Sequence, residues 1–116
     1  MSDKDKNDGV VKVPTSKALN LGELIAYQDG SVVSREVLKS PAGTITVFAF
    51  DAGQGLSEHS APFDAVVTVL DGVCEFTIGG EPVVGQAGQT VIMPANVPHA
   101  LHAAQKFKML LVMIKG

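Results

Sequence analysis

The chain has 116 residues, a net charge of −3 and a pI near 5.5. It contains no basic cluster, so nucleic acids and anionic membranes are poor candidates for partners. No apolar run approaches the roughly 18 residues of a membrane span, and the polar N-terminus lacks the apolar stretch of a secretory signal. The one cysteine, Cys74, cannot form an internal disulfide. These features predict a cytoplasmic protein.

The N-terminal part of the chain predicts a tail followed by one domain. Residues 1–9 are polar and charged, which is typical of a disordered tail, and residues 10–116 form the expected domain. Val10–Val13 is a short β-like run, and Glu23–Tyr27 is a second strand candidate that ends at a turn signal.

From residue 31 onward, short apolar segments alternate with turn signals. Thr44–Phe50 and Val73–Ile78 alternate residue by residue, the pattern of a strand with two different faces. The Asp-Gly pair before Val73 is a strong hairpin signal. The expected strands are Ser31–Leu38, Thr44–Phe50, Asp64–Leu70, Val73–Ile78, Pro82–Val84, Thr90–Met93, His99–Ala103 and Lys106–Ile114. No convincing helical period is present, so the chain is expected to be all-β, a sandwich or barrel with little or no helix.

The last expected strand, Lys106–Ile114, is apolar on both of its faces. A strand of this kind must be covered on both sides. In a chain of this size a second subunit is a natural cover, so the sequence predicts a homodimer.

Two segments carry the candidate site. Gly53–Gly72 reads GQGLSEHSAPFDAVVTVLDG and Gly88–His102 reads GQTVIMPANVPHALH. Their spacing resembles the two motifs of the cupins. The first cupin motif is Gly, five residues, His-x-His, three or four residues, Glu, six residues and Gly, and the second places Pro-x-Gly and then His after a glycine. The resemblance implies a small cupin, a double-stranded β-helix or jelly-roll barrel, with His59 and His99 facing each other inside it.

The chain departs from the family pattern at four positions. Metal-binding cupins use two histidines and a glutamate from the first motif and one histidine from the second. Here Ala61 and Ala65 occupy the positions of the second histidine and the glutamate. Asn96 replaces the glycine of the second motif, and Ala103 replaces its asparagine.

A metal is one hypothesis for the pair. The resemblance implies a divalent transition metal (Zn, Ni, Fe or Mn) at His59 and His99, with Asp64 and His102 as candidate additional ligands. Such metals usually draw on three or four protein ligands. Strand alternation turns His102 and Glu58 outward and Leu101 and Ala103 inward, if His99 and His59 point inward.

A pocket is a second hypothesis, with the histidines as polar anchors among apolar walls. Alternation places Ser57 on the same face as His59. The expected ligand-binding set is His59, His99, Ser57, Val67, Met93 and Leu101.

Three functions stay open at this point. The first is a small-molecule-binding barrel without catalysis. The second, implied by the resemblance, is a metal-dependent dioxygenase, isomerase or decarboxylase of a small acid or sugar. The third is a structural role in which the histidines are hydrogen-bonded core residues.

Overall fold

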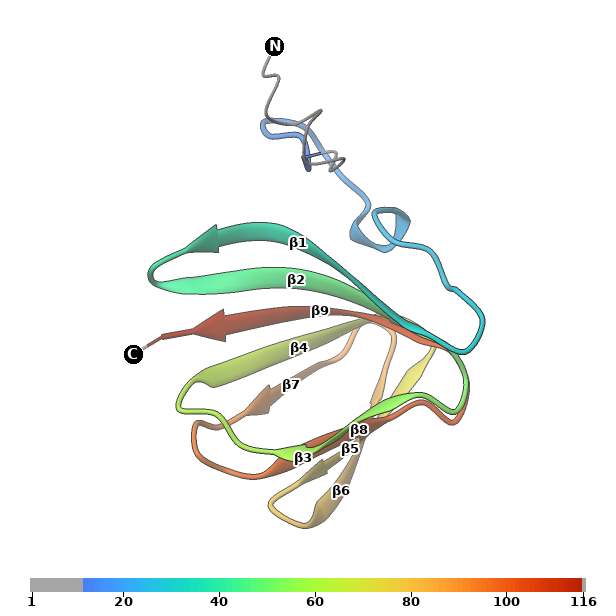
Figure 1. Cartoon of the computed structure of the whole chain (residues 1–116), viewed down its shortest axis with the longest axis vertical. Helices are drawn as coiled ribbons and strands as arrows, with labels where there is room; N and C mark the ends of the chain where they lie inside the picture. Colours follow the sequence, from blue (N-terminus) through green and yellow to red (C-terminus); the bar gives the residue numbers. More distant parts are fainter. Residues whose placement is uncertain (1–11, 116) are drawn as a thin grey trace.

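The computed structural model describes residues 12–115, so the expected tail at 1–9 lies outside the described residues (Figure 1). Two antiparallel sheets face each other and form a double-stranded β-helix. The larger sheet has the order β1-β2-β9-β4-β7 and the smaller sheet β3-β8-β5-β6. The strands are β1 Val32–Ser40, β2 Gly43–Phe50, β3 Gly55–His59, β4 Asp64–Asp71, β5 Val73–Ile78, β6 Glu81–Gln86, β7 Thr90–Met93, β8 His99–His102 and β9 Phe107–Ile114.

The Asp71-Gly72 turn joins β4 to β5, but the two strands belong to different sheets and do not pair, so the predicted hairpin is wrong. Gly72 has a φ of +74°, a conformation that side chains other than glycine rarely adopt. A Cβ at this position would also lie 2.5 Å from the carbonyl oxygen of Lys106. The turn therefore requires glycine for two reasons: its positive φ, and the close contact between Gly72 and the backbone of Lys106 just before β9.

The core lies between the two sheets and comes from alternate residues of their strands. Phe50 and Phe107 are fully buried and pack edge to face, with ring centroids 4.5 Å apart. Each such side chain contributes about 2–3 kcal/mol by leaving water. Cys74 belongs to this core, and its burial, with a smaller effect of the neighbouring Glu75 carboxylate, raises its pKa to about 12. The thiol is therefore a core group and not a nucleophile at neutral pH.

Residues 12–31 are here called the N-terminal arm, and within it Leu21, Leu24, Ile25 and Tyr27 pack on one end of the outer face of the larger sheet. Ile25 is buried against Val47 and Ala49. Because Ile25 packs as part of an irregular segment, the predicted strand Glu23–Tyr27 is wrong. That region holds the 3-10 helix η1, Leu21–Glu23, and then bends and coil.

The predicted strand Val10–Val13 is only partly described. Residues 10–11 lie outside the described residues, and Lys12 and Val13 are not in a strand. Among residues 12–115, no helix is long and apolar enough to span a membrane.

Polar contacts fasten the N-terminal arm to the barrel. The Tyr27 hydroxyl donates a 2.5 Å hydrogen bond to Asp71 at the end of β4. The Lys108 ammonium donates a 2.6 Å bond to the carbonyl oxygen of Gly22. The ammonium groups of Lys106 and Lys108 lie 4.9 and 5.0 Å from the centre of the Tyr27 ring, within range of a cation–π interaction. These contacts hold the arm over the sheet.

Candidate functional site

The fold brings His59 and His99 together. They end β3 and begin β8, two neighbouring antiparallel strands of the smaller sheet, and they are direct partners in its register. Their ring centroids are 4.5 Å apart, and the ring planes meet at 68°. His99 is buried with 6% of its surface exposed, whereas His59 is exposed. The pair therefore has an inner and an outer member.

Backbone carbonyls fix the tautomer of both rings. Nδ1 of His59 lies 2.8 Å from the carbonyl oxygen of Ser57, and Nδ1 of His99 lies 3.1 Å from that of Val97. A carbonyl oxygen only accepts hydrogen bonds, so Nδ1 must carry the proton in each ring. In a neutral imidazole, Nε2 then holds the lone pair. The two rings thus offer Nε2, and not Nδ1, to a ligand.

Nε2 of His99 is reachable although its residue is buried. This atom makes no hydrogen bond. Among residues 12–115, every side-chain nitrogen or oxygen that is fully shielded from solvent has a hydrogen-bond partner, so the unbonded Nε2 must be accessible to solvent. The third hypothesis has both histidines as hydrogen-bonded core residues, and each ring does bond a backbone carbonyl oxygen through Nδ1. His59 is exposed, however, and Nε2 of the buried His99 stays unbonded. This arrangement favours a site over a purely structural pair.

The histidines line an apolar cavity of about 60 Å³. A water molecule needs roughly 10–15 Å³ measured in this way, so the cavity accommodates only a few waters or one very small group. Typical ligand pockets are about 300–1,000 Å³. The lining residues besides the two histidines are Leu56, Ala61, Phe63, Ala65, Met93, Leu101, Met109, Leu111 and Met113.

Two members of the expected ligand-binding set do not line this cavity. A β-bulge between Leu56 and His59 shifts the alternation by one residue, so Leu56 and not Ser57 shares the inward side with His59. The Ser57 side chain is exposed, and only its carbonyl oxygen serves the site. Val67 points inward but is fully buried in the core away from the cavity. Met93 and Leu101 lie where expected, in the cavity wall.

The additional metal ligands do not join the histidines. Asp64 is exposed, and its carboxylate accepts a 2.9 Å hydrogen bond from the amide of Ala95. His102 is exposed and faces outward, as does Glu58, in agreement with strand alternation. Within residues 12–115 no group of three or more His, Cys, Asp or Glu side chains could hold a metal ion. Two imidazoles alone do not fit a protein-only transition-metal site.

The β3–β4 loop, which contributes Ala61 and Phe63 to the cavity, is bonded to the β7–β8 loop. The amide of Asn96 in the β7–β8 loop donates a 2.7 Å bond to the carbonyl oxygen of Ala61 in the β3–β4 loop. Asn96 has a φ of +65°, and asparagine is among the few residues that tolerate this conformation. Asparagine therefore meets the backbone requirement of the glycine that it replaces.

Sequence reasoning missed five lining residues: Leu56, Phe63, Met109, Leu111 and Met113. A signal for the last three exists, because they repeat every second residue along β9. Leu56 could not be found in this way, since the bulge that turns it inward has no clear mark in the sequence.

Comparison with known proteins decides the family. A family model described as a cupin domain matches residues 46–115, more than half of the chain. The chain belongs to the cupin family. A conserved protein of unknown function from Streptococcus pyogenes is 39% identical, with 92% of this chain and 94% of that chain covered and a TM-score of 0.86. A cupin 2 conserved barrel domain protein from Leptotrichia buccalis is 40% identical, with 84% of this cupin and 47% of that chain covered and a TM-score of 0.81. No match was found among curated proteins.

A third solved structure shows the fold alone. A cupin superfamily protein from Desulfitobacterium hafniense is 24% identical, with 91% of this chain and 97% of that chain covered and a TM-score of 0.85. Within this cupin, the two motif positions that hold alanine in place of histidine and glutamate, Ala61 and Ala65, both line the cavity beside the histidine pair. The sequence departures therefore fall at the site itself.

Proposed function

We propose that this cupin binds a small, largely apolar molecule through one hydroxyl or carboxylate group held at His59 and His99. The observation that carries the proposal is the pair of imidazoles with Nδ1 bonded to backbone and Nε2 left for a ligand, inside an otherwise apolar cavity. A few placed polar groups among apolar walls are the usual composition of a small-molecule site.

The histidine pair suits a hydroxyl or a carboxylate. A neutral Nε2 accepts a hydrogen bond from a hydroxyl, and a protonated Nε2 donates one to a carboxylate oxygen. The nine other lining residues offer only carbon and thioether groups, so the rest of the ligand should be apolar. A ligand with several hydroxyls, such as a sugar, would leave most of its polar groups without partners, at a cost of about 1–3 kcal/mol each.

The methionine side chains allow the cavity to expand. Three of the four methionines in the chain, Met93, Met109 and Met113, line it. Methionine has flexible torsions and a polarisable sulfur, so it repacks around irregular shapes at low cost. Binding of a molecule larger than the 60 Å³ cavity is therefore expected to proceed by movement of these side chains.

The alternative is a metal-dependent dioxygenase, isomerase or decarboxylase with a reduced ligand set. The offered Nε2 atoms favour it, because histidine commonly ligates metals through that atom while Nδ1–H bonds a carbonyl. The shortage of ligands weighs against it, since solvent or substrate would have to supply the remaining positions. We therefore place metal-free binding first.

The test is a titration of the protein labelled with ¹³C at its methionine methyl groups, using butyrate and 1-butanol as probes. Binding in the cavity should shift the signals of Met93, Met109 and Met113, the three methionines that line it. His59→Ala should weaken binding at least about tenfold, the worth of one hydrogen bond of about 1.4 kcal/mol.

His102→Ala is the matched control, because His102 is exposed on the outer face of β8. It should leave the affinity for both probes unchanged. Absence of shifts in the three cavity methionines, or equal affinity in His59→Ala, would contradict the proposal. A stoichiometric transition metal that copurifies with the wild type and is lost in His59→Ala would replace it with the metal-dependent alternative.

A further inference from the structure

The cavity beside the histidine pair is rich in sulfur. Three of its lining residues, Met93, Met109 and Met113, are methionines, and the whole chain has only four. Apart from these and the two imidazoles, every lining side chain is a hydrocarbon. The side-chain donor atoms that the described residues offer to the cavity are therefore imidazole nitrogens and thioether sulfurs, without a carboxylate.

Two of these methionines flank the position at which metal-binding cupins place their glutamate. Ala65 occupies this position, and it pairs with Met93 on β7 and with Met113 on β9. Such partners point to the same face of a sheet, with Cβ atoms about 5 Å apart. All three residues line the cavity. Soft thioether groups thus lie on both sides of the position where the family has a hard oxygen ligand.

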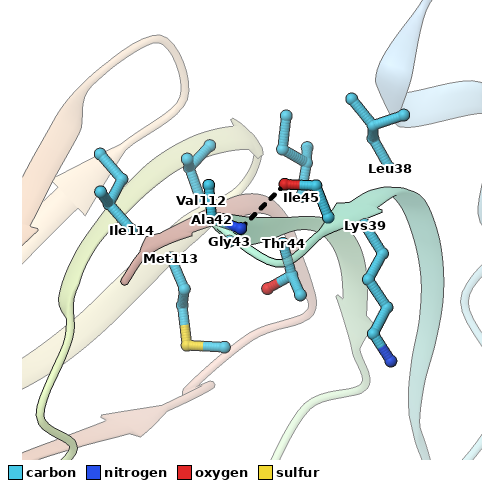
Figure 2. Close-up of a pocket in the computed structure, with 10 residues that line it drawn as sticks. Leu38, Lys39, Ala42, Gly43, Thr44, Ile45, Val112, Met113 and Ile114 are labelled. Carbon is cyan, nitrogen blue, oxygen red and sulfur yellow. Dashed lines mark hydrogen bonds between the residues drawn. The ribbon is translucent and has the colours of Figure 1, made fainter. Parts of the chain in front are cut away.

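The register of β9 directs Met113 to the inner side of the larger sheet. Figure 2 shows Met113 pointing to the opposite side from its neighbours Val112 and Ile114. Thr44, the partner of Met113 on β2, points to the same side as Met113 (Figure 2). This is the alternation of an extended strand. The backbone therefore holds the Met113 side chain on the cavity side of the sheet.

The two imidazoles can supply nitrogen ligands to the same cavity. The hydrogen bonds from Nδ1 to backbone carbonyl oxygens leave the lone pair on Nε2 of His59 and His99. A carbonyl oxygen bonded to the other ring nitrogen is a common support for a metal-bound histidine, because it fixes the ring. Two nitrogens and two sulfurs thus give the donor count that histidine and carboxylate alone do not reach.

The charge of this donor set selects a monovalent ion. Neutral imidazole and thioether carry no charge, so the charge of a bound ion stays uncompensated in an apolar cavity. The Born cost of such an ion rises with the square of its charge, so a divalent ion costs about four times as much as a monovalent ion of equal size. Among monovalent ions, thioether and imidazole ligands favour copper(I), whereas copper(II) prefers tetragonal sites of nitrogen and oxygen.

The size of the cavity also suits an ion. Its volume is about 60 Å³. A water molecule needs roughly 10–15 Å³ measured in this way, so an ion smaller than water enters without expansion of the cavity. His59 is exposed and lines the cavity, so the donors can be reached from that side.

We propose that the cavity binds one copper(I) ion through Nε2 of His59 and His99 and the sulfur atoms of Met93 and Met113. This site goes beyond the proposed function and does not depend on it, because the thioether ligands take no part in holding a hydroxyl or carboxylate. The ion and the organic molecule use the same two Nε2 atoms, so they are alternative occupants of the cavity.

Anaerobic titration of the full chain against the coloured copper(I) complex of bicinchoninate tests the site. The wild type should withdraw one copper(I) ion per chain. Replacing both thioethers, by Met93→Leu and Met113→Leu together, should weaken copper(I) binding at least about tenfold while preserving side-chain volume. His102→Ala is the matched control and should bind as the wild type does, because His102 is exposed outside the cavity. Cys74 does not compete, since it is fully buried in the core.

Methyl-¹³C labels on the methionines give a second readout. Copper(I) is diamagnetic, so the methyl signals of Met93 and Met113 should shift without broadening when the ion binds. Zinc should leave these signals in place, because its double charge finds no carboxylate partner in the cavity. Circular dichroism confirms that each variant is folded.

A wild type that takes no copper(I) from bicinchoninate overturns the proposal, as does equal copper(I) affinity in the double leucine variant. Zinc binding as tight as copper(I) binding would overturn the choice of a soft monovalent ion. These results leave the proposed function untouched, because that function is tested separately by titrating copper-free protein with butyrate and 1-butanol.

Discussion

Restoring the two ligand positions that hold alanine should convert the cavity into a metal site. In the double variant Ala61→His and Ala65→Glu, the new side chains join His59 and His99 to give the four ligands of the metal-binding cupins. Both alanines line the cavity beside the histidines, so the new groups enter it. A four-ligand set matches the usual count for zinc and related metals.

Without metal, the double variant should be less stable than the wild type. Ala65 is 5% exposed and pairs with Met93 on one side and Met113 on the other, so a carboxylate there lies among thioethers. An uncompensated buried charge of this kind costs about 3 kcal/mol or more. At about 4 °C per kcal/mol for a domain of this size, Tm should fall by about 12 °C.

Metal should reverse this loss. At a free metal concentration 100 times Kd, binding stabilises the folded state by about 2.7 kcal/mol, so Tm should rise by about 10 °C. The assay is thermal unfolding with and without ZnCl₂ after treatment with a chelator. The triple variant with His59→Ala is the control and should show a smaller rise. A wild type that zinc stabilises as strongly as the double variant would refute the reasoning, as would a folded double variant that does not respond to zinc.

Two further predictions concern the scaffold. Burial, followed by the hydrogen bond to Asp71, raises the pKa of Tyr27 above its ordinary value, so this contact stabilises the fold below about pH 10 and is lost as the pH rises further. In urea, the free energy of unfolding of Tyr27→Phe should be about 1 kcal/mol lower than that of the wild type at neutral pH, and this difference should become smaller in alkaline buffer. Equal free energies of unfolding at neutral pH would contradict this. A Cβ on Gly43 would lie 2.1 Å from a carbonyl oxygen of β9, so Gly43→Ala should cost more than about 2 kcal/mol in the same assay, whereas Gly22→Ala, with open space around it, should cost little.

Much of the fold could be predicted from local pattern. Strict alternation in Thr44–Phe50 and Val73–Ile78 indicates a strand in each segment, and both strands are present. The inward face of β8, with His99 and Leu101 buried and His102 exposed, also follows from alternation alone, and that prediction is confirmed.

What failed depended on contacts between distant residues. Glu23–Tyr27 has the composition of a strand, but its place is set by Ile25 packing on β2 and by Tyr27 bonding to Asp71, 44 residues away. The ammonium groups of Lys106 and Lys108, about 80 residues further along the chain, also lie against the ring of Tyr27. Tertiary packing decides such segments, and a short window of sequence does not contain it.

The site was only partly predictable for a similar reason. Motif spacing located His59, His99 and the alanines at the ligand positions, because a barrel fixes which motif residues point inward. Motif spacing wrongly placed the Ser57 side chain in the site, because one bulge in β3 shifts the alternation by one residue. The size of the cavity depends on how the side chains of Met109 and Met113 pack into it, and this packing cannot be predicted from the amino-acid composition.

The most direct test of the histidine pair is a long-range ¹H–¹⁵N spectrum of the imidazole rings, recorded in mildly alkaline buffer with and without 1-butanol. The account predicts that His59 and His99 carry the proton on Nδ1 and that their Nε2 signals move when a probe is added, while His102 stays unchanged. Protons on Nε2 in both rings, or Nε2 signals of His59 and His99 that do not move when 1-butanol is added, would contradict it.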